Sequence, residues 1–163
     1  MQPKKISLRQ LAQTPRPLRI ELCADWLAAC IRRGHPDVEQ VRDGCFQGRG
    51  YLTSQGAVIQ GRIELEFTAV CSRCLGPIDV RAQVPCRWIA SDVRELIADD
   101  LETLPVDGSG QVDLAAPMAE AIDLNLPSVL LCSNDCRGLC ARCGADLNRG
   151  PCGCSIGPKA RQE

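Results

Sequence analysis

Regular alternation of apolar and polar positions dominates the middle of the chain. From Ala57 to Cys71 every second residue is apolar or glycine, and most residues between them are polar or charged. The same alternation returns from Ile78 to Trp88. A period of two is the pattern of a half-buried strand. The pattern therefore predicts two long antiparallel strands, joined by the cysteine-bearing turn 71–77.

Two helices are expected to pack on these strands. The first runs from Asp25, a possible N-cap, to Arg33, and Gly34 ends it. The second begins after Asp113, its expected N-cap, and ends before Pro127. Its predicted apolar stripe consists of Leu114, Met118, Ala121, Ile122 and Leu124.

Shorter apolar stretches add strands to the sheet. Alternation at 18–22 predicts one, residues 51–53 lead into a hairpin turn at 54–56, and residues 129–131 form a brief apolar strand. The predicted fold class is α+β: a twisted antiparallel β-sheet with two main helices and a C-terminal cysteine-rich zinc-binding segment.

The same patterns suggest how the chain is divided. Residues 1–131 form an α+β core domain, within which residues from about 92 to 110 are an acidic, solvated linker. Residues 132–155 are a zinc-knuckle segment, and residues 156–163 a flexible tail.

Composition narrows the functional classes. A net charge of −1 over 163 residues argues against a general nucleic-acid binder, which would carry a basic face. Two Trp, two Phe and one Tyr offer few platforms for stacking bases. An RNA role would therefore rest on a local patch or on a protein partner. The single histidine, His35, excludes most histidine-dependent catalysis.

The N-terminal residues suggest a cytoplasmic protein. The stretch 6–20 is interrupted by polar residues and by Pro15 and Pro17, so it lacks the apolar core of a signal peptide. No run approaches the roughly 18 apolar residues of a membrane span. In a reducing compartment, clustered thiols bind metals more often than they form disulfides.

Six cysteines lie between positions 132 and 154. Cys140 and Cys143, followed by Gly144, have the spacing of a metal-binding knuckle. Cys152 and Cys154 follow a Gly-Pro turn that can return them to this knuckle. These four cysteines are the first predicted zinc site.

A second zinc site is one of two hypotheses for the remaining thiols. Cys71, Cys74, Cys132 and Cys136 would complete it, giving two Cys₄ sites. The rival hypothesis keeps one zinc, held by any four of the six C-terminal cysteines. The other four cysteines are interpreted as structural: Cys23, Cys30, Cys45 and Cys86.

Enzymatic activity is not expected. A zinc ion held by four protein ligands has no open position for water, so each site would have a structural role. Cys71-x-x-Cys74 could be a redox dithiol, but such motifs normally open a helix, and Leu75-Gly76-Pro77 breaks one. There is no phosphate loop, nucleophile motif or histidine cluster, and we expect no small-molecule substrate.

The cysteine motifs carry a resemblance to a known family. They are Cys71-x-Arg73-Cys74-Leu75, then Cys136-x-Gly138-Leu139-Cys140-x-x-Cys143-Gly144-x-x-Leu147-Asn148, and Cys152-x-Cys154. Together with Asp113-Leu114, Glu120-x-Ile122 and Leu126-Pro127, they resemble the YceD family over about residues 45–155.

The YceD family consists of bacterial and plastid proteins required for accumulation of large-subunit ribosomal RNA. The resemblance implies a non-enzymatic ribosome biogenesis factor acting on 23S rRNA or a pre-large-subunit particle, directly or through a protein. If it contacts RNA, the candidate residues are Arg73, Arg137, Arg142 and Arg149. The alternative is a cytosolic protein-interaction adaptor that does not touch RNA.

Overall fold

Two long strands form the centre of the molecule, as the alternation predicts. The computed structural model describes residues 4–54, 56–91 and 103–154. In it, β5 (Gly56–Val70) and β6 (Pro77–Ser91) are each 15 residues long and pair antiparallel. Ile63, Phe67 and Val84 point to one face and are almost fully buried, so the prediction of a half-buried hairpin is confirmed.

Four further strands complete the main sheet: β2 (Arg16–Leu22), β3 (Val38–Val41), β4 (Gly44–Thr53) and β7 (Thr103–Pro105). The strand order is β2-β4-β5-β6-β7, and β3 pairs with the part of β5 beyond β4. Every pairing among the described strands is antiparallel except that of β6 with β7. A separate two-stranded sheet joins β1 (Lys5–Ser7) to β8 (Gln111–Asp113). The remaining described elements are a 3₁₀ turn η1 (Leu8–Gln10) and the helices α1 (Ala24–Ile31) and α3 (Ala115–Asn125).

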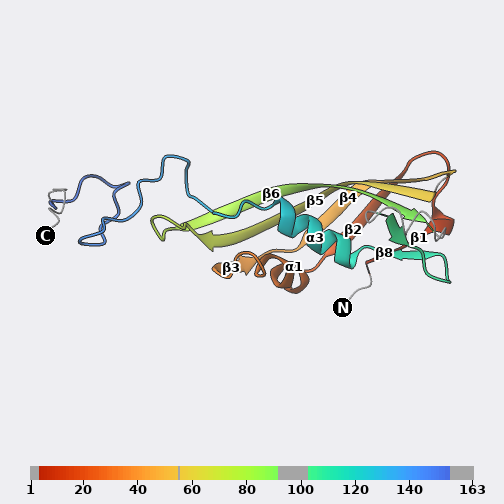
Figure 1. Cartoon of the computed structure of the whole chain (residues 1–163), viewed down its shortest axis with the longest axis horizontal. Coiled ribbons are helices and arrows are strands. Elements are labelled where there is room, and N and C mark those ends of the chain that lie inside the picture. Colours follow the sequence, from red (N-terminus) through yellow and green to blue (C-terminus); the bar gives the residue numbers. More distant parts are fainter. Residues whose placement is uncertain (1–3, 55, 92–102, 155–163) are drawn as a thin grey trace, which may run out of the picture.

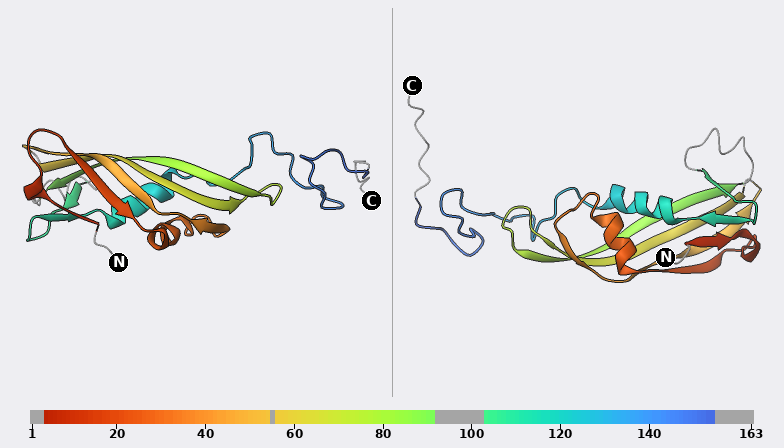
Figure 2. Two further views of the ribbon diagram at one scale, coloured as in Figure 1. Left: turned by 180° about the vertical axis from the view of Figure 1, so that it is seen from behind. Right: turned by 90° about the horizontal axis from the view of Figure 1, so that it is seen from below.

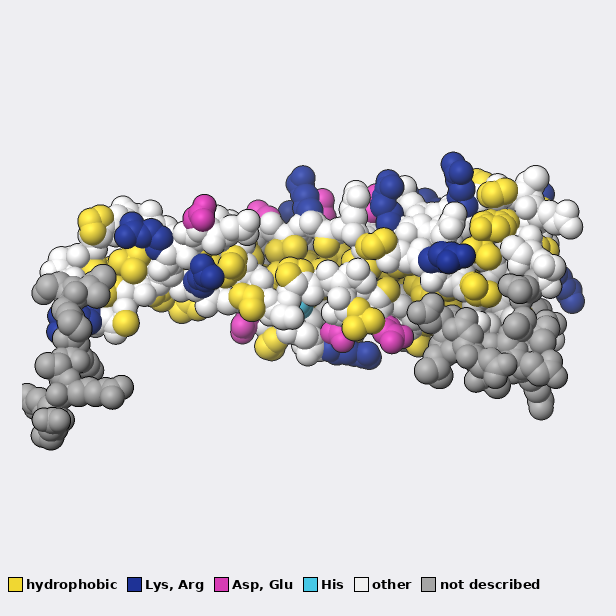
Figure 3. All heavy atoms as spheres, turned by 45° about the horizontal axis from the view of Figure 1, so that its top comes forward, with side chains coloured by type: hydrophobic (Ala, Val, Ile, Leu, Met, Phe, Trp, Pro, Cys, Tyr) yellow, Lys and Arg dark blue, Asp and Glu magenta, His cyan; other side chains and the backbone are white. Residues whose placement is uncertain are grey.

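The two helices cover one face of the sheet and leave the other to solvent (Figures 1 and 2). Leu27 and Ile31 of α1 and Met118 and Ile122 of α3 are buried against this inner face, next to Phe46 of β4. The outer face carries exposed charged side chains (Figure 3). This is the α+β architecture expected from the sequence.

Both helices begin one or two residues away from the predicted caps. The N-cap of α1 is Cys23 rather than Asp25, and the Ala24 N–H donates instead to Oδ1 of Asp43, at 2.7 Å. The N-cap of α3 is Leu114, although Asp113 Oδ1 still accepts the Ala115 N–H at 2.8 Å. In each case a carboxylate accepts a backbone N–H that has no partner within the helix.

Three local predictions are wrong. Leu124 is 75% exposed, because a residue two positions after Ile122 points to the opposite side of a helix. Cys23 is exposed at the start of α1, whereas Cys30 is buried as expected. Residues 129–131 form no strand; Leu130 makes a single backbone hydrogen bond, with Ser72, instead of a ladder.

Part of the predicted acidic linker has regular structure. Residues 103–105 form β7, and Asp107 Oδ1 closes a turn by accepting hydrogen bonds from Ser109 and Gln111. The rest of that linker, residues 92–102, and the predicted tail, 156–163, lie outside the described residues.

The molecule is elongated, and its C-terminal segment extends beyond one end of the sheet (Figure 1). After α3 the chain passes the β5–β6 turn and continues away from the core without helix or strand. We call residues 132–154 the appendage. Within the described residues, no helix is long and apolar enough to cross a membrane.

Candidate metal centre

The turn between β5 and β6 presents two cysteines at the end of a rigid hairpin. The Cys71 N–H donates to the Gly76 carbonyl at 2.8 Å, and the Leu75 N–H donates to the Cys71 carbonyl at 2.9 Å. Leu75 has a φ of 58°, the left-handed conformation that glycine adopts more easily. This tight turn places Cys71 and Cys74 on the same side.

The segment that follows α3 brings two more thiols to this turn. The Ser72 N–H donates to the Leu130 carbonyl at 2.9 Å, which fixes the approach of the segment. The sulfurs of Cys71 and Cys136 are then 3.7 Å apart, and those of Cys74 and Cys132 are also 3.7 Å apart. These four cysteines form what we call the hairpin cluster.

The other four cysteines form a tail cluster within the appendage. The Gly144 N–H donates to the Cys140 carbonyl at 2.8 Å, and Gly144 has a φ of 72°. The Cys140 N–H donates to the Ala145 carbonyl at 2.8 Å. Cys152 and Cys154 return to this turn. In each cluster the four sulfur atoms lie within 4.8 Å of one another.

Hydrogen bonds in the hairpin cluster move its thiol pKa values in opposite directions. Burial raises the pKa of Cys71, but backbone N–H groups of Cys74, Arg73 and Cys132 donate to its sulfur and lower its pKa to about 6. Hydrogen bonding to the Cys136 sulfur, with desolvation, raises the pKa of Cys132 to about 12. Some of these thiols therefore remain protonated at neutral pH when no cation is near.

The tail cluster shows the same division. Backbone N–H groups of Arg142 and Cys143 lower the pKa of Cys140 to about 6, whereas hydrogen bonding to the Cys143 sulfur raises the pKa of Cys154 to about 12. Four thiolates this close repel one another, because like charges disfavour ionisation. A divalent cation at the centre removes that repulsion.

Both clusters fit a tetrahedral metal ion. A zinc–sulfur bond of about 2.3 Å implies a sulfur tetrahedron with edges of about 3.8 Å, and the two printed contacts of the hairpin cluster are 3.7 Å. The groups match the two sets of four that the two-site hypothesis predicts. The chain therefore contains two four-cysteine clusters that can bind metal ions, each with its four positions filled by protein.

Asn148, which lies between the two cysteine pairs of the tail cluster in sequence, contacts the hairpin cluster. Its Oδ1 accepts the Arg137 N–H at 2.7 Å, and its Nδ2 donates to the Cys136 sulfur at 3.4 Å. The neighbouring Leu147 N–H donates to the Gly138 carbonyl at 2.9 Å. The sequence motif includes Asn148, but the sequence did not predict its contact with Cys136. The only sequence signal for this contact is a side-chain amide five residues after Cys143, and that signal is weak.

The four candidate RNA-contact arginines differ in their surroundings. Arg73 Nη1 donates to the Cys136 carbonyl at 3.1 Å, so this side chain supports the hairpin cluster. Arg149 Nε lies 3.6 Å from Asp146 Oδ2. Arg137 and Arg142 are exposed. The four residues come from separate turns.

Among the described residues, none of the four cysteines outside the clusters belongs to a group of three or more potential metal ligands. Cys30, Cys45 and Cys86 are buried, and burial raises the pKa of Cys86 to about 11. All twelve cysteines lie in the described part of the chain, and none forms a disulfide. Disulfide bonds between the clustered cysteines, the alternative to metal binding, are therefore not present in this structure.

A protein-family comparison matches most of the region that holds these clusters. The model described as "Large ribosomal RNA subunit accumulation protein YceD" matches residues 59–161. The match includes most of β5, all of β6 and α3, and all eight clustered cysteines.

Curated mycobacterial proteins are also similar. Uncharacterized proteins from Mycobacterium bovis and Mycobacterium tuberculosis are each 32% identical over 102 residues, covering 60% of this chain and 48% of the relative. One from Mycobacterium leprae is 29% identical over 98 residues, covering 58% of this chain and 44% of the relative. The chain thus spans about half the length of the curated relatives it matches. No solved structure matches.

Proposed function

This chain belongs to the YceD family of large ribosomal RNA subunit accumulation proteins, and we propose that it is a ribosome biogenesis factor supporting 23S rRNA accumulation or processing. The family match over residues 59–161 is the observation that carries this proposal. The partner would be ribosomal RNA or a pre-large-subunit particle in the cytoplasm.

The role we propose is non-enzymatic, with zinc as a structural cofactor. The family is not known as a family of enzymes. Thiolate ligands in a tetrahedral set of four favour zinc. One zinc in each cluster would fold an appendage that has no helix or strand of its own, because binding free energy becomes folding free energy in such segments.

A thiol redox role is less well supported. The Cys71-x-x-Cys74 turn leads directly into strand β6, whereas redox dithiols normally lie at the start of a helix. Cys71 is also fully buried, with 0% of its surface exposed, so a thiol of another molecule could not reach its sulfur.

Sedimentation of native lysate tests the main proposal. Tagged protein is separated on a sucrose gradient, and the RNA in its fractions is identified. Co-migration with immature large-subunit particles that carry 23S rRNA is the expected result. Protein found only at the top of the gradient, without rRNA, would contradict the proposal.

A protein-binding adaptor is the second candidate, and the net charge of −1 favours it. In the RNA-contacting version, we propose that the exposed Arg137 and Arg142 contact phosphates. Changing both to Glu should then weaken crosslinking to rRNA without lowering the melting temperature. Unchanged crosslinking would favour the adaptor.

A further inference from the structure

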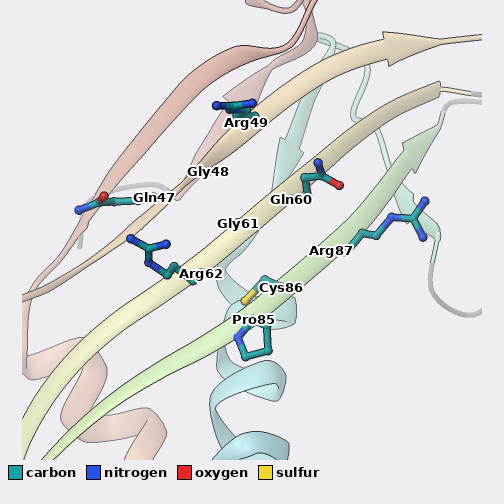
Figure 4. A pocket seen from close by; sticks show the side chains of 9 residues that line it. All are labelled: Gln47, Gly48, Arg49, Gln60, Gly61, Arg62, Pro85, Cys86 and Arg87. Carbon is teal, nitrogen blue, oxygen red and sulfur yellow. The ribbon is translucent and has the colours of Figure 1, made fainter.

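The outer face of the sheet contains a hollow far from the cysteine clusters (Figure 4). It lies across β4, β5 and β6, where Gly48 and Gly61 face each other across neighbouring strands. The polar side chains that line it are Gln47, Arg49, Gln60, Arg62 and Arg87.

The strands beneath this hollow pack closely at Gly48 and Gly61. A Cβ added at Gly61 would collide with the Gln47 carbonyl oxygen, and one added at Gly48 would collide with the Gln60 carbonyl oxygen. Only glycine allows the two backbones to approach so closely. The long side chains that line the hollow belong to the residues next to these glycines along the strands, such as Gln47, Arg49, Gln60 and Arg62 (Figure 4).

Three arginines line the hollow. Arg49 and Arg87 both lie opposite Gln60 in the strand register, on either side of it. Arg62 is two residues further along β5, so it is a diagonal neighbour of both. Among the described residues, Arg62 pairs with Glu64 at 2.8 Å, but Arg49 and Arg87 form no ion pair. The described residues that line the hollow include no carboxylate.

The rest of the outer face is different. Towards the cysteine end of the sheet, Glu66 pairs with Arg42 at 3.1 Å and with Arg81 at 3.2 Å. On β2, Arg19 pairs with Glu21 at 2.6 Å. A hollow in that region is lined by both carboxylates and arginines. Among the described residues, the arginines of those regions are thus paired with carboxylates, whereas Arg49 and Arg87 of the hollow are not.

We propose that this hollow binds the sugar–phosphate backbone of RNA. Arg49 and Arg87 contact phosphate oxygens through their planar donor forks. The carboxamides of Gln47 and Gln60 hydrogen-bond phosphate or ribose 2′-hydroxyl groups. This inference rests on the proposed function, and names the surface through which the protein contacts rRNA.

Two observations favour RNA over an acidic peptide. The carboxamides beside the arginines add donors and acceptors that a ribose hydroxyl can use, whereas a run of carboxylates needs only positive charge. Tyr51, the chain's single tyrosine, lies on the same face two residues beyond Arg49, where its ring can stack on a base.

Binding of a fluorescein-labelled single-stranded RNA by the full zinc-loaded chain tests the proposal. The test variant is Arg49→Gln with Arg87→Gln. The control is Arg42→Gln with Arg81→Gln, which removes the same charge from the same sheet but from arginines that are paired with Glu66. We expect the test variant to bind about tenfold more weakly. The slope of the logarithm of its binding constant against the logarithm of the salt concentration should become shallower by about 1.4, or roughly 0.7 for each lost phosphate contact. The control should bind like the parent.

Three results would overturn the inference. The two variants could lose affinity equally, which would indicate a diffuse charge effect. The test variant could bind like the parent. A poly-glutamate peptide could compete for the hollow as well as RNA does, which would indicate an acidic protein partner.

The same variants on the sucrose gradient separate this inference from the proposed function. If the parent does not migrate with immature large-subunit particles, the proposed function fails. If the parent and the Arg49/Arg87 variant both migrate with them equally, only the inference about the hollow fails.

Discussion

The hairpin cluster and the tail cluster use the same local turn in different surroundings. Both are built on a Cys-x-Arg-Cys sequence, residues 71–74 and 140–143, followed by a residue with positive φ. In both, the N–H of that residue donates to the first cysteine's carbonyl, at 2.9 and 2.8 Å. The turns differ in what lies around them.

The hairpin cluster joins distant parts of the chain. Its two sulfur contacts connect residues separated by 65 and 58 positions, so it fastens the appendage to the β5–β6 hairpin. The tail cluster takes its four ligands from residues 140–154 alone. The comparison suggests that the first cluster docks the appendage and the second folds it.

Loss of the hairpin cluster should have the largest effect. Cys136→Ser removes one of its ligands and releases the appendage from the hairpin. We expect the free energy that protects the appendage from opening to fall by on the order of 4 kcal/mol or more, as for the loss of a structural metal. Hydrogen exchange should show faster exchange throughout residues 132–154, while β4 and β5 keep their protection.

Cys23→Ser is the matched control, because Cys23 is exposed and belongs to neither cluster. Its exchange should match that of the parent. If Cys136→Ser left the appendage protected, the docking role of the hairpin cluster would be wrong.

Loss of the tail cluster should have a more local effect. Cys140→Ser is expected to speed exchange in residues 140–154 and leave the hairpin cluster and the strands folded, because the tail cluster has no ligand from the sheet. Circular dichroism and hydrogen exchange measure this. Unfolding of the whole protein would mean that the appendage is part of the main core.

Removal of the Asn148 contact with the hairpin cluster should have an intermediate effect. Asn148→Ala deletes the acceptor of the Arg137 N–H and the donor to the Cys136 sulfur. The cost should be about 0.5–1.5 kcal/mol, the net contribution of an ordinary hydrogen bond, since Asn148 is exposed and water can take its place. Metal release to a chelator should become faster, whereas Asn134→Ala, an exposed control in the same segment, should not change it. Equal release rates would mean that the clusters are independent.

Substitution of the residue that ends each turn should have the smallest effect. The two turns should respond in opposite directions to opposite substitutions. Leu75 occupies a left-handed position that costs about 1 kcal/mol or more for a residue with a side chain. Leu75→Gly should therefore raise the melting temperature slightly. Gly144→Ala should lower the melting temperature, because it should reduce the free energy of unfolding by about 1 kcal/mol. An added Cβ at Gly144 meets nothing within 4 Å, so only the backbone is strained. If both substitutions raised the melting temperature, or both lowered it, the two turns would not be equivalent.

Sequence patterns predicted what depends on local chemistry. Alternation from Ala57 to Trp88 gave the hairpin, because one face of each strand must be buried. Cysteine spacing gave the tail cluster, since all four ligands are close in sequence. The grouping of the hairpin cluster was one of two hypotheses, because nothing local brings Cys136 to Cys71.

Features that depend on register could not be predicted. The hollow lies where Gly48 pairs with Gly61, and its arginines Arg49 and Arg87 both lie opposite Gln60. A shift by one residue would send these side chains to the other face. The contact of Asn148 with the hairpin cluster likewise depends on how the appendage folds back. The exposure of Leu124 depends on how helix α3 is rotated about its axis.

The metal content of the intact protein tests the central claim most directly. Native mass spectrometry of the full chain should show a mass increase equal to two zinc ions, and Cys136→Ser and Cys140→Ser should each retain one. A single zinc ion in the parent protein would contradict the account, because one of the clusters would then be without the ion that it is proposed to hold.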